Sequence, residues 1–260
     1  MLSGLAGSWR YRSFVLSSIA GELRSRINRS RLGVLWLVVP PLAQVAIFSQ
    51  VMAARLPGVE GAFAYSIYLM AGLLAWTLFT EVLTRSLTIF IDNAGILKKI
   101  SFPKMTLPLI VYGVAAINSA ILTAAVLVGF VLMGHWPWPT LLWLPVLAVL
   151  CSTLALSLGV ILGVLNVFVR DVGQVTNIAL QVGFWFTPIV YLPEIVPESV
   201  RWLLKFNPMY WIVTGYHDAL VYGRSPNLAS LAVVAVLVAV LSCLALLVYR
   251  RASAEMVDVL

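Results

Sequence analysis

The sequence predicts an all-α polytopic membrane protein with six transmembrane helices. Of its 260 residues, 62% are hydrophobic and only 10% are charged, and the mean hydropathy is +1.00. This composition excludes a soluble globular protein. Apolar runs of about 20 residues, enough to cross about 30 Å of hydrocarbon, recur along the chain. On so apolar a chain, the net charge of +7 indicates membrane orientation more than nucleic-acid binding.

The first element is a predicted amphipathic helix over residues 9–30, lying along the inner membrane surface. Its apolar stripe consists of Trp9, Tyr11, Phe14, Val15, Leu16, Ile19, Leu23 and Ile27, and its cationic positions are Arg10, Arg12, Arg24, Arg26 and Arg29. The scattered arginines leave no compact apolar core before a cleavage site, which excludes a secretory signal peptide. Two roles stay open for this segment: lipid anchoring alone, or anchoring combined with docking of a partner.

Six apolar runs follow, each bounded by charge, Pro or Gly. They cover residues 32–53, 63–80, 107–133, 141–168, 176–191 and 228–249. The fifth is the shortest, because Pro188, followed by Pro193 and Pro197, ends or kinks its helix. The chain from there to residue 222 is amphipathic and aromatic, and we expect it to dip into the outer membrane face. Residues 81–104 form the expected inner connection between the second and third runs.

The positions of Lys and Arg predict the orientation. With both termini inside, thirteen of the seventeen lie on the inner side: Arg10, Arg12, Arg24, Arg26, Arg29, Arg31, Arg85, Lys98, Lys99, Lys104, Arg170, Arg250 and Arg251. The other four, Arg55, Arg201, Lys205 and Arg224, share the outer side with Glu60, Glu194, Glu198 and Asp218. The inner side therefore carries the whole charge excess, which predicts that both termini are cytoplasmic.

The polar residues narrow the range of mechanisms. The apolar runs hold almost no ionisable groups, whereas proton-coupled carriers and intramembrane enzymes need carboxylates or histidines at membrane depth. No Gly-Lys dipeptide occurs, so the sequence lacks a phosphate-binding loop of the Gly-x-x-x-x-Gly-Lys-Ser/Thr type. If ATP drives the protein, a partner has to supply it by docking on the short inner elements. Cys151 and Cys243 lie in apolar runs without His or Asp companions, which predicts packing residues and no metal site or disulfide.

Few residues offer catalytic chemistry. Glu81 and Arg85 are four positions apart, as in a helical ion pair near the inner end of the second run. His217 and Asp218 are adjacent, and because adjacent helical residues do not face one another, a structural role is favoured. An integral-membrane enzyme acting on lipid-linked sugars stays an alternative. Its candidate residues are His217 with Asp218, and Glu194 with Glu198.

Five short motifs resemble those of one known family. They are residues 31–36 (RLGVLW) leading to Pro40, residues 93–104 with Phe102 and Pro103, residues 168–174 (FVRDVGQ), residues 186–191 (FTPIVY), and Asn207-Pro208-Met209. In this order, within a six-span and basic-inside chain, they resemble the transmembrane subunit of ABC-2-type exporters of lipid-linked polysaccharide. The resemblance implies one ABC-2-type transmembrane domain over residues 1–260, with a cytoplasmic segment 1–30, a six-span bundle 31–250 and a cytoplasmic tail 251–260.

The same resemblance implies a homodimer in the bacterial cytoplasmic (inner) membrane. Two copies of a separate ATPase subunit would hold ATP and Mg, and no cofactor is expected in this chain. Similar proteins contact that ATPase through segments corresponding to residues 9–30 and 81–104, and close the outer end with re-entrant helices corresponding to residues 193–222. The expected ATPase-coupling residues are Arg10, Arg12, Arg24, Arg26, Asn93, Lys98, Lys99, Arg170 and Asp171. For Arg170 and Asp171, an inner anchor and a favourable helix-start charge form the alternative.

The motifs at residues 170–174 and 187–191 favour O-antigen as the exported polymer. Capsular polysaccharide and teichoic acid exporters of the same family stay open, and so does a drug or lipid exporter of the same architecture.

We expect aromatic residues to line the translocation path, because pyranose rings present apolar C–H faces that can slide over aromatic rings without a deep binding minimum. The candidates are Tyr65, Tyr68, Trp76, Phe79, Phe184, Trp185 and Tyr191. Trp76 lies inside its run, where an indole N–H needs a partner or an aqueous lumen. The competing explanation is that Trp and Tyr gather at membrane interfaces while Phe fills helix contacts.

Overall fold

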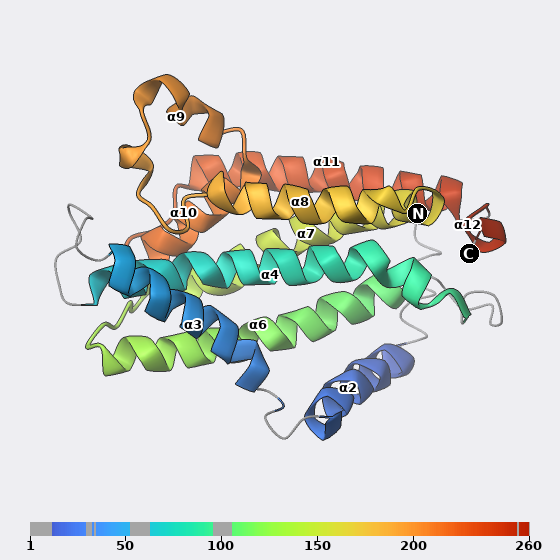
Figure 1. Ribbon diagram of the computed structural model, residues 1–260, viewed down its shortest axis with the longest axis horizontal. Helices are drawn as coiled ribbons and strands as arrows, with labels where there is room; N and C mark the ends of the chain where they lie inside the picture. The colour runs from blue at the N-terminus through green and yellow to red at the C-terminus, as the bar shows by residue number, and fades with distance from the viewer. Residues whose placement is uncertain are drawn as a thin grey trace.

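The computed structural model describes residues 12–29, 33, 35–52, 63–95, 106–253 and 255–259, without the side chains of residues 26–29, 52, 257 and 258. The regular secondary structure within these ranges is helical (Figure 1). Its elements are α2 (Arg12–Arg29), α3 (Leu35–Met52), α4 (Ala64–Asp92), α6 (Thr106–Leu132), η2 (Thr140–Leu142), α7 (Trp143–Phe168), α8 (Asp171–Trp185), η3 (Pro193–Ile195), α9 (Glu198–Leu204), α10 (Pro208–Leu220), α11 (Leu228–Ala252) and α12 (Glu255–Val259). The predicted all-α class is confirmed for this part of the chain.

Four helical segments are long and apolar enough to cross a membrane. They are α4, α6, the continuous stretch Thr140–Phe168 formed by η2 and α7, and α11. These correspond to the predicted second, third, fourth and sixth runs. The first run forms α3, whose apolar part is the shorter helix Leu35–Val51, and the fifth forms the 15-residue helix α8.

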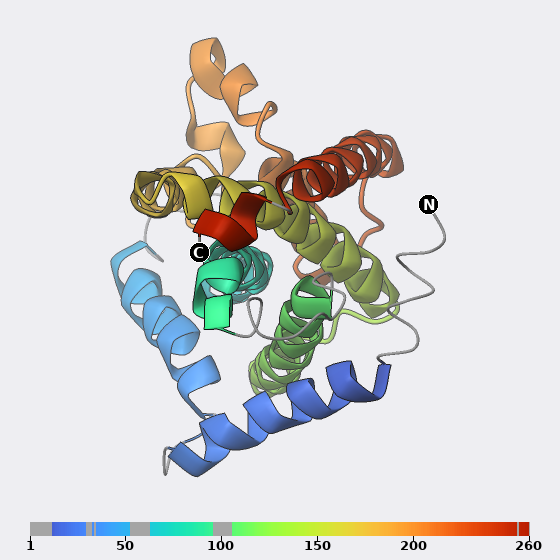
Figure 2. The same ribbon diagram turned by 90° about the vertical axis from the view of Figure 1, so that its right-hand side faces the viewer.

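The long helices lie side by side along the long axis of the molecule, with α4 in the middle (Figures 1 and 2). α4 packs against α3, α6, α7, α8 and α10. α12 lies at one end of the bundle, while α9 stands away from the bundle near the opposite end (Figure 1). α2 runs crosswise beside the bundle, toward the end where α12 lies, and packs against α6 (Figures 1 and 2).

Burial in this bundle is distributed as in a membrane protein. Within the most apolar stretch of each helix, 72% of the residues of α4 but only 22% of those of α11 are buried, although α11 is the more apolar helix. A water-soluble protein would bury its most apolar helix, whereas a lipid-facing helix presents that surface outward. This distribution of burial fits a multi-pass membrane protein.

The predicted end of the second run at Thr80 is wrong, because α4 continues through Glu81 to Asp92. Residues 81–92, which were expected to begin the inner connection, form three further turns of this helix. Val82, Leu83 and Phe90 in this part are buried. Glu81 and Arg85 interrupt the apolar run in sequence, but they share one helical side and leave an apolar side that packs into the bundle.

The fifth run also has different bounds from those predicted. α8 begins at Asp171, five residues before the predicted start, and ends at Trp185, six before the predicted end. Asp171 lies in the first turn, where its charge complements the helix dipole. The chain after Trp185 leaves the helix ahead of Pro188, which has no N–H to donate and disfavours helical geometry at the residue before it.

α4 and α7 approach each other most closely where α7 carries glycine. A methyl group added to Gly163 would lie 2.5 Å from the backbone oxygen of Ser86, and one added to Gly159 would lie 2.5 Å from the Ser86 Cβ atom and 3.0 Å from the Leu83 backbone oxygen. Backbone atoms cannot rotate away, so larger residues would force the two helices apart. Close helix contact through small residues is how membrane helices gain packing energy.

We predict that Gly163→Ala destabilises the protein by about 1–3 kcal/mol, the usual cost of overpacking, despite the better helix propensity of alanine. The measurement is the melting temperature of the purified chain in detergent, which should fall by several degrees. Gly129→Ala on α6 is the matched control, because its added methyl group would lie 3.8 Å from the Met70 sulfur, an ordinary contact. Equal melting temperatures for the two variants would contradict this account of the α4–α7 contact.

Candidate functional site

The chain between α8 and η3 is an irregular break at the same end of the bundle as the start of α4. Its first turn is held locally, since the Thr187 hydroxyl donates to the Gly183 carbonyl at 2.8 Å. The Asn207 amide in turn donates to the Thr187 hydroxyl at 2.8 Å. Asn207 also caps α10, because its side-chain oxygen accepts from the Met209 N–H at 2.9 Å, and Pro208 occupies the first helical turn. The end of α8 and the start of α10 are thus fixed to each other.

Two tyrosines of α4 supply donors to the carbonyl groups of this break. The Tyr65 hydroxyl donates to the Val190 carbonyl at 2.8 Å. The Tyr68 hydroxyl lies 2.9 Å from the Tyr191 carbonyl and 3.1 Å from the Pro188 carbonyl, within donating distance of both. Both side chains are buried. Since a buried carbonyl without a donor costs free energy, these bonds stabilise the break.

His217 of α10 also contacts Tyr68. Its ring stacks on the Tyr68 ring with centroids 3.8 Å apart. Its Nε2 atom lies 3.1 Å from the Tyr68 carbonyl and donates to it, because a carbonyl oxygen can only accept. Gly72, one turn further along α4, leaves room for this ring: a methyl group there would lie 3.0 Å from Nε2.

Below this contact, aromatic side chains of α4 and α8 form a cluster, which we call the aromatic cluster: Trp76, Phe79, Phe184 and Trp185. The Trp76 ring lies 5.7 Å from Phe79 and 5.8 Å from Phe184, and Phe184 lies 5.4 Å from Trp185. Phe79 is buried, Trp76 and Phe184 are half-buried, and Trp185 is 58% exposed. The cluster therefore runs from the packed interior to the open side of α8.

The seven predicted path residues thus lie in two groups. Trp76, Phe79, Phe184 and Trp185 meet in the aromatic cluster. Tyr65, Tyr68 and Tyr191 lie at the break, where each hydroxyl donates to a backbone carbonyl; that of Tyr191 reaches the Trp185 carbonyl at 2.9 Å. The structure gives these tyrosines a role in holding the break, and their contact with a polymer stays a prediction.

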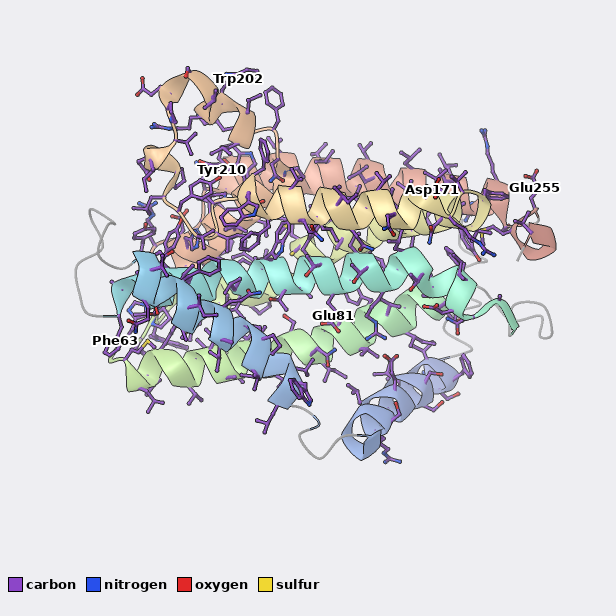
Figure 3. The ribbon with its side chains drawn as sticks, in the orientation of Figure 1. Phe63, Glu81, Asp171, Trp202, Tyr210 and Glu255 are labelled. Atoms are coloured by element: carbon purple, nitrogen blue, oxygen red, sulfur yellow. The ribbon has the colours of Figure 1, made fainter. Side chains whose placement is uncertain are left out.

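The opposite end of the bundle carries the coupling residues that the structure describes. Arg170 and Asp171 form the exposed turn between α7 and α8, and Figure 3 shows Asp171 at the end where Glu255 also lies. Asn93 follows α4 and its amide donates to the Ile89 carbonyl at 2.8 Å. Arg24 is exposed on α2. Arg12 opens α2.

Other coupling candidates cannot be placed. Arg10, Lys98 and Lys99 lie outside the described residues, and so does the side chain of Arg26.

A polar network, not predicted from the sequence beyond its central pair, joins three helices near this end. Glu22 of α2 forms an ion pair with Arg85 of α4. The Arg85 Nη1 atom lies 3.6 Å from Glu81 Oε1, as the i,i+4 spacing predicts. The Asn118 amide of α6 donates to the same Glu81 oxygen. We call these four residues the inner network. Asn118 is a polar residue within a strongly apolar run, and this isolated polarity is the sequence feature that could have indicated a buried polar contact.

The turn between α7 and α8 depends on a second asparagine that sequence reasoning missed. Asn166 donates to the Leu87 carbonyl of α4 at 3.2 Å and accepts from the Gly173 N–H at 3.0 Å. This side chain ties the exposed turn that holds Arg170 and Asp171 to the inner half of α4.

The residues considered for an enzyme do not form a shared site. His217 is held against Tyr68, whereas Asp218 pairs with Arg224, whose Nη2 atom lies 2.7 Å from Asp218 Oδ1. Glu194 and Glu198 are exposed on η3 and α9. Figure 3 shows Tyr210 and Trp202 in this outer region, far from Glu255. No specific observation favours catalysis here.

Comparison with known proteins identifies the family. The model of the ABC-2 type transporter family matches residues 14–221. The chain is 30% identical to the O-antigen export system permease protein RfbA of Myxococcus xanthus over 226 residues, 84% of each chain. It is 28% identical to a protein of that name from Klebsiella pneumoniae over 207 residues, 78% of each chain. The polysialic acid transport protein KpsM of Escherichia coli is 22% identical over 238 residues, 88% of this chain and 89% of that protein.

The matched region begins within α2 and ends just after α10, so it contains both the inner network and the outer break. With this match over most of its length, the chain belongs to the ABC-2 type transporter family.

Proposed function

We propose that this chain is the permease subunit of an ATP-driven exporter of lipid-linked polysaccharide, and that its substrate is O-antigen. The observation that carries the proposal is the similarity, over about four-fifths of the chain, to relatives named as O-antigen export permeases. The relative named for polysialic acid transport is less similar, at 22% identity. Capsular polysaccharide is therefore the second choice of substrate.

Energy in this proposal comes from a separate ATPase subunit, which holds ATP and Mg. The sequence has no Gly-Lys dipeptide and hence no Walker-type phosphate loop of its own. The proposed docking surface consists of α2, the end of α4 at Asn93 and the exposed turn at Arg170 and Asp171. These elements share one end of the bundle, as a docked subunit requires. Arg10, Arg12, Arg24, Arg26, Asn93, Lys98 and Lys99 complete the proposed set of coupling residues.

α3 and α8 are the remaining two spans in this proposal. At 1.5 Å per residue, the 18 residues of α3 extend about 27 Å and the 15 residues of α8 about 22 Å. α8 alone is shorter than the roughly 30 Å of hydrocarbon. The break after it is then located within the outer leaflet, and α10, which is fixed to it through Asn207, re-enters the membrane. The tyrosine donors of α4 meet the need for satisfied carbonyls at such a depth.

The proposed assembly is a homodimer around a shared path. Figure 2 shows α3 and α8 on the same side of α4. Both helices carry exposed apolar side chains. The aromatic cluster opens toward this side through Trp185. A second copy facing it would enclose a path lined by aromatic rings from both subunits, with Tyr65, Tyr68 and Tyr191 at its outer end.

The proposed location is the bacterial cytoplasmic membrane with both termini inside. Arg170, Arg250 and Arg251 lie at one end of the bundle, together with α2 and its arginines. Arg201 and Arg224 belong to the outer segment that also holds Glu194, Glu198 and Asp218. By the positive-inside rule, the end that holds Arg170, Arg250 and Arg251 would face the cytoplasm.

Deleting the gene for this chain from its source bacterium should abolish surface O-antigen, because polymer made on the inner side has no passage outward. The measurement is the lipopolysaccharide ladder on gels, together with lipid-linked polymer in the cytoplasmic fraction, which should accumulate. A plasmid copy of the chain should restore the ladder. An intact ladder in the deletion strain would overturn the O-antigen assignment, and the loss of capsule instead would favour the second choice of substrate.

Deleting residues 1–28 should uncouple the ATPase while leaving the spans in the membrane, because most of α2 is removed and the long apolar helices remain. We expect loss of ATPase co-purification and of export with a normal amount of membrane-inserted chain. Deleting residues 1–8 is the matched control, since it keeps the whole predicted amphipathic segment. Wild-type co-purification and export in the longer deletion would contradict the docking role.

Replacing Trp76 or Trp185 by Leu should lower export about tenfold, which corresponds to a loss of about 1.4 kcal/mol of favourable interaction during passage. The variants should still insert, dimerise and bind the ATPase, because leucine retains most of the apolar volume. Tyr191→Leu should act similarly, whereas Tyr191→Phe keeps the ring and removes only its bond to the Trp185 carbonyl.

Trp136→Leu serves as the control, because Trp136 is 59% exposed in the turn after α6 and lies outside the aromatic cluster. Normal export by assembled Trp76→Leu and Trp185→Leu variants would refute the aromatic path. Failure of these variants to assemble would refute it as well, and would assign the rings a packing role.

A further inference from the structure

α2 meets the bundle through both apolar and polar contacts. The Ile19 side chain of α2 occupies the space that a side chain at position 113 of α6 would need, so Gly113 provides a notch for it. One helical turn further on, Glu22 forms its ion pair with Arg85 of α4. The same side of α2 therefore touches two different spans.

Arg85 is shared between acids from two helices. Glu22 approaches it from α2, and Glu81 from the preceding turn of α4, with side-chain exposures of 31% and 19%, against 21% for Arg85. Glu81 is in turn bonded by the buried Asn118 of α6. A continuous chain of polar contacts thus leads from α2 through α4 to α6.

Arg85 and Glu81 lie well inside α4, away from its end at Asp92, and this position bears on what their ion pairs contribute. By helix rise, Arg85 and Glu81 are about 10 Å and 16 Å from the Asp92 end of α4. Ion pairs at an aqueous surface contribute little, and buried pairs carry a desolvation cost that apolar residues of similar volume avoid. Attachment of α2 alone would therefore be served as well by more contacts of the Ile19 kind. What an ion pair adds is a defined position, because Glu22 has to reach one particular guanidinium group.

We propose that Arg85 is a positioning residue that couples α2 to the membrane spans. It holds α2 through Glu22 and is itself held by Glu81, which Asn118 orients from α6. Displacement of α2 by the docked ATPase subunit is passed through Arg85 to α4 and, through Glu81, to α6. This inference rests on the proposed function, since it needs the ATPase as the source of movement.

α4 can carry such a displacement to the outer break. Tyr68, which holds the carbonyls of the break, lies 17 residues from Arg85 on the same unbroken helix, or about 26 Å along its axis. Arg85 is thus connected to the break by one helix and by the hydrogen bonds of Tyr68 to the carbonyl groups of the break.

The test is a double-mutant cycle with Glu22→Gln, Arg85→Gln and the two combined, in the full chain with its ATPase subunit. Three quantities are measured: ATPase co-purification, the rate of ATP hydrolysis and the amount of polysaccharide exported per ATP hydrolysed. Each single variant should bind the ATPase normally and lower the export per ATP about tenfold, within the usual range of coupling between sites. The double variant should be no worse than the poorer single one, because both remove the same contact.

Glu255→Gln and Arg251→Gln are the matched controls. Both residues are exposed at the same end of the bundle and lie outside the inner network, so export per ATP should not change. If Arg85→Gln does not accumulate, Glu22→Gln alone decides, because it leaves Arg85 paired with Glu81 and so preserves the fold.

Unchanged export per ATP in folded Glu22→Gln would overturn the proposal. Losses that multiply in the double variant would do the same, because they would show two independent contacts, and loss of ATPase binding in the single variants would assign the pair a docking role instead. Failure of the proposed function itself is seen separately: the unmodified chain would then neither co-purify with an ATPase nor support export.

Discussion

A buried backbone carbonyl group that leaves a helix needs a donor from elsewhere in the protein, and this constraint organises the half of the protein around the break. α8 ends at Trp185, and the chain cannot resume a regular helix across Pro188. The carbonyl groups that follow accept hydrogen bonds from Tyr65 and Tyr68. α4 therefore has to lie directly beside the break.

α4 makes polar contacts near each end of the bundle. Near the outer end it presents Tyr68 to His217 and the break, and near the other end it presents Arg85 to Glu22. Close to Arg85, at Leu83 and Ser86, glycines of α7 allow close packing against the backbone of α4, which restricts sliding of one helix past the other. α4 is consequently the element through which a change at one end can reach the other, as a rigid helix with defined partners at both ends.

The sequence predicts the helices better than the contacts between them. Apolar runs reveal where helices lie, because lipid imposes a length of about 20 residues. Local composition predicts too early an end for the run at α4, because Glu81 and Arg85 look like a boundary, whereas the helix continues to Asp92. Their spacing predicts a pair with each other, but Glu22 lies 63 positions before Arg85, and nothing in a single sequence specifies that partner. Tertiary packing decides it.

The aromatic residues show how contacts divide side chains that residue type alone groups together. The sequence treats seven of them as one class, because a ring suits both a sugar path and a membrane interface. The structure separates them by their polar atoms: each tyrosine hydroxyl donates to a backbone carbonyl at the break, while Trp76 and Trp185 meet their neighbours through ring contacts. A mobile polymer needs weak contacts, whereas a helix break needs strong ones. The partners of the hydroxyl groups therefore separate the tyrosines that hold the break from the rings that are candidates for the path.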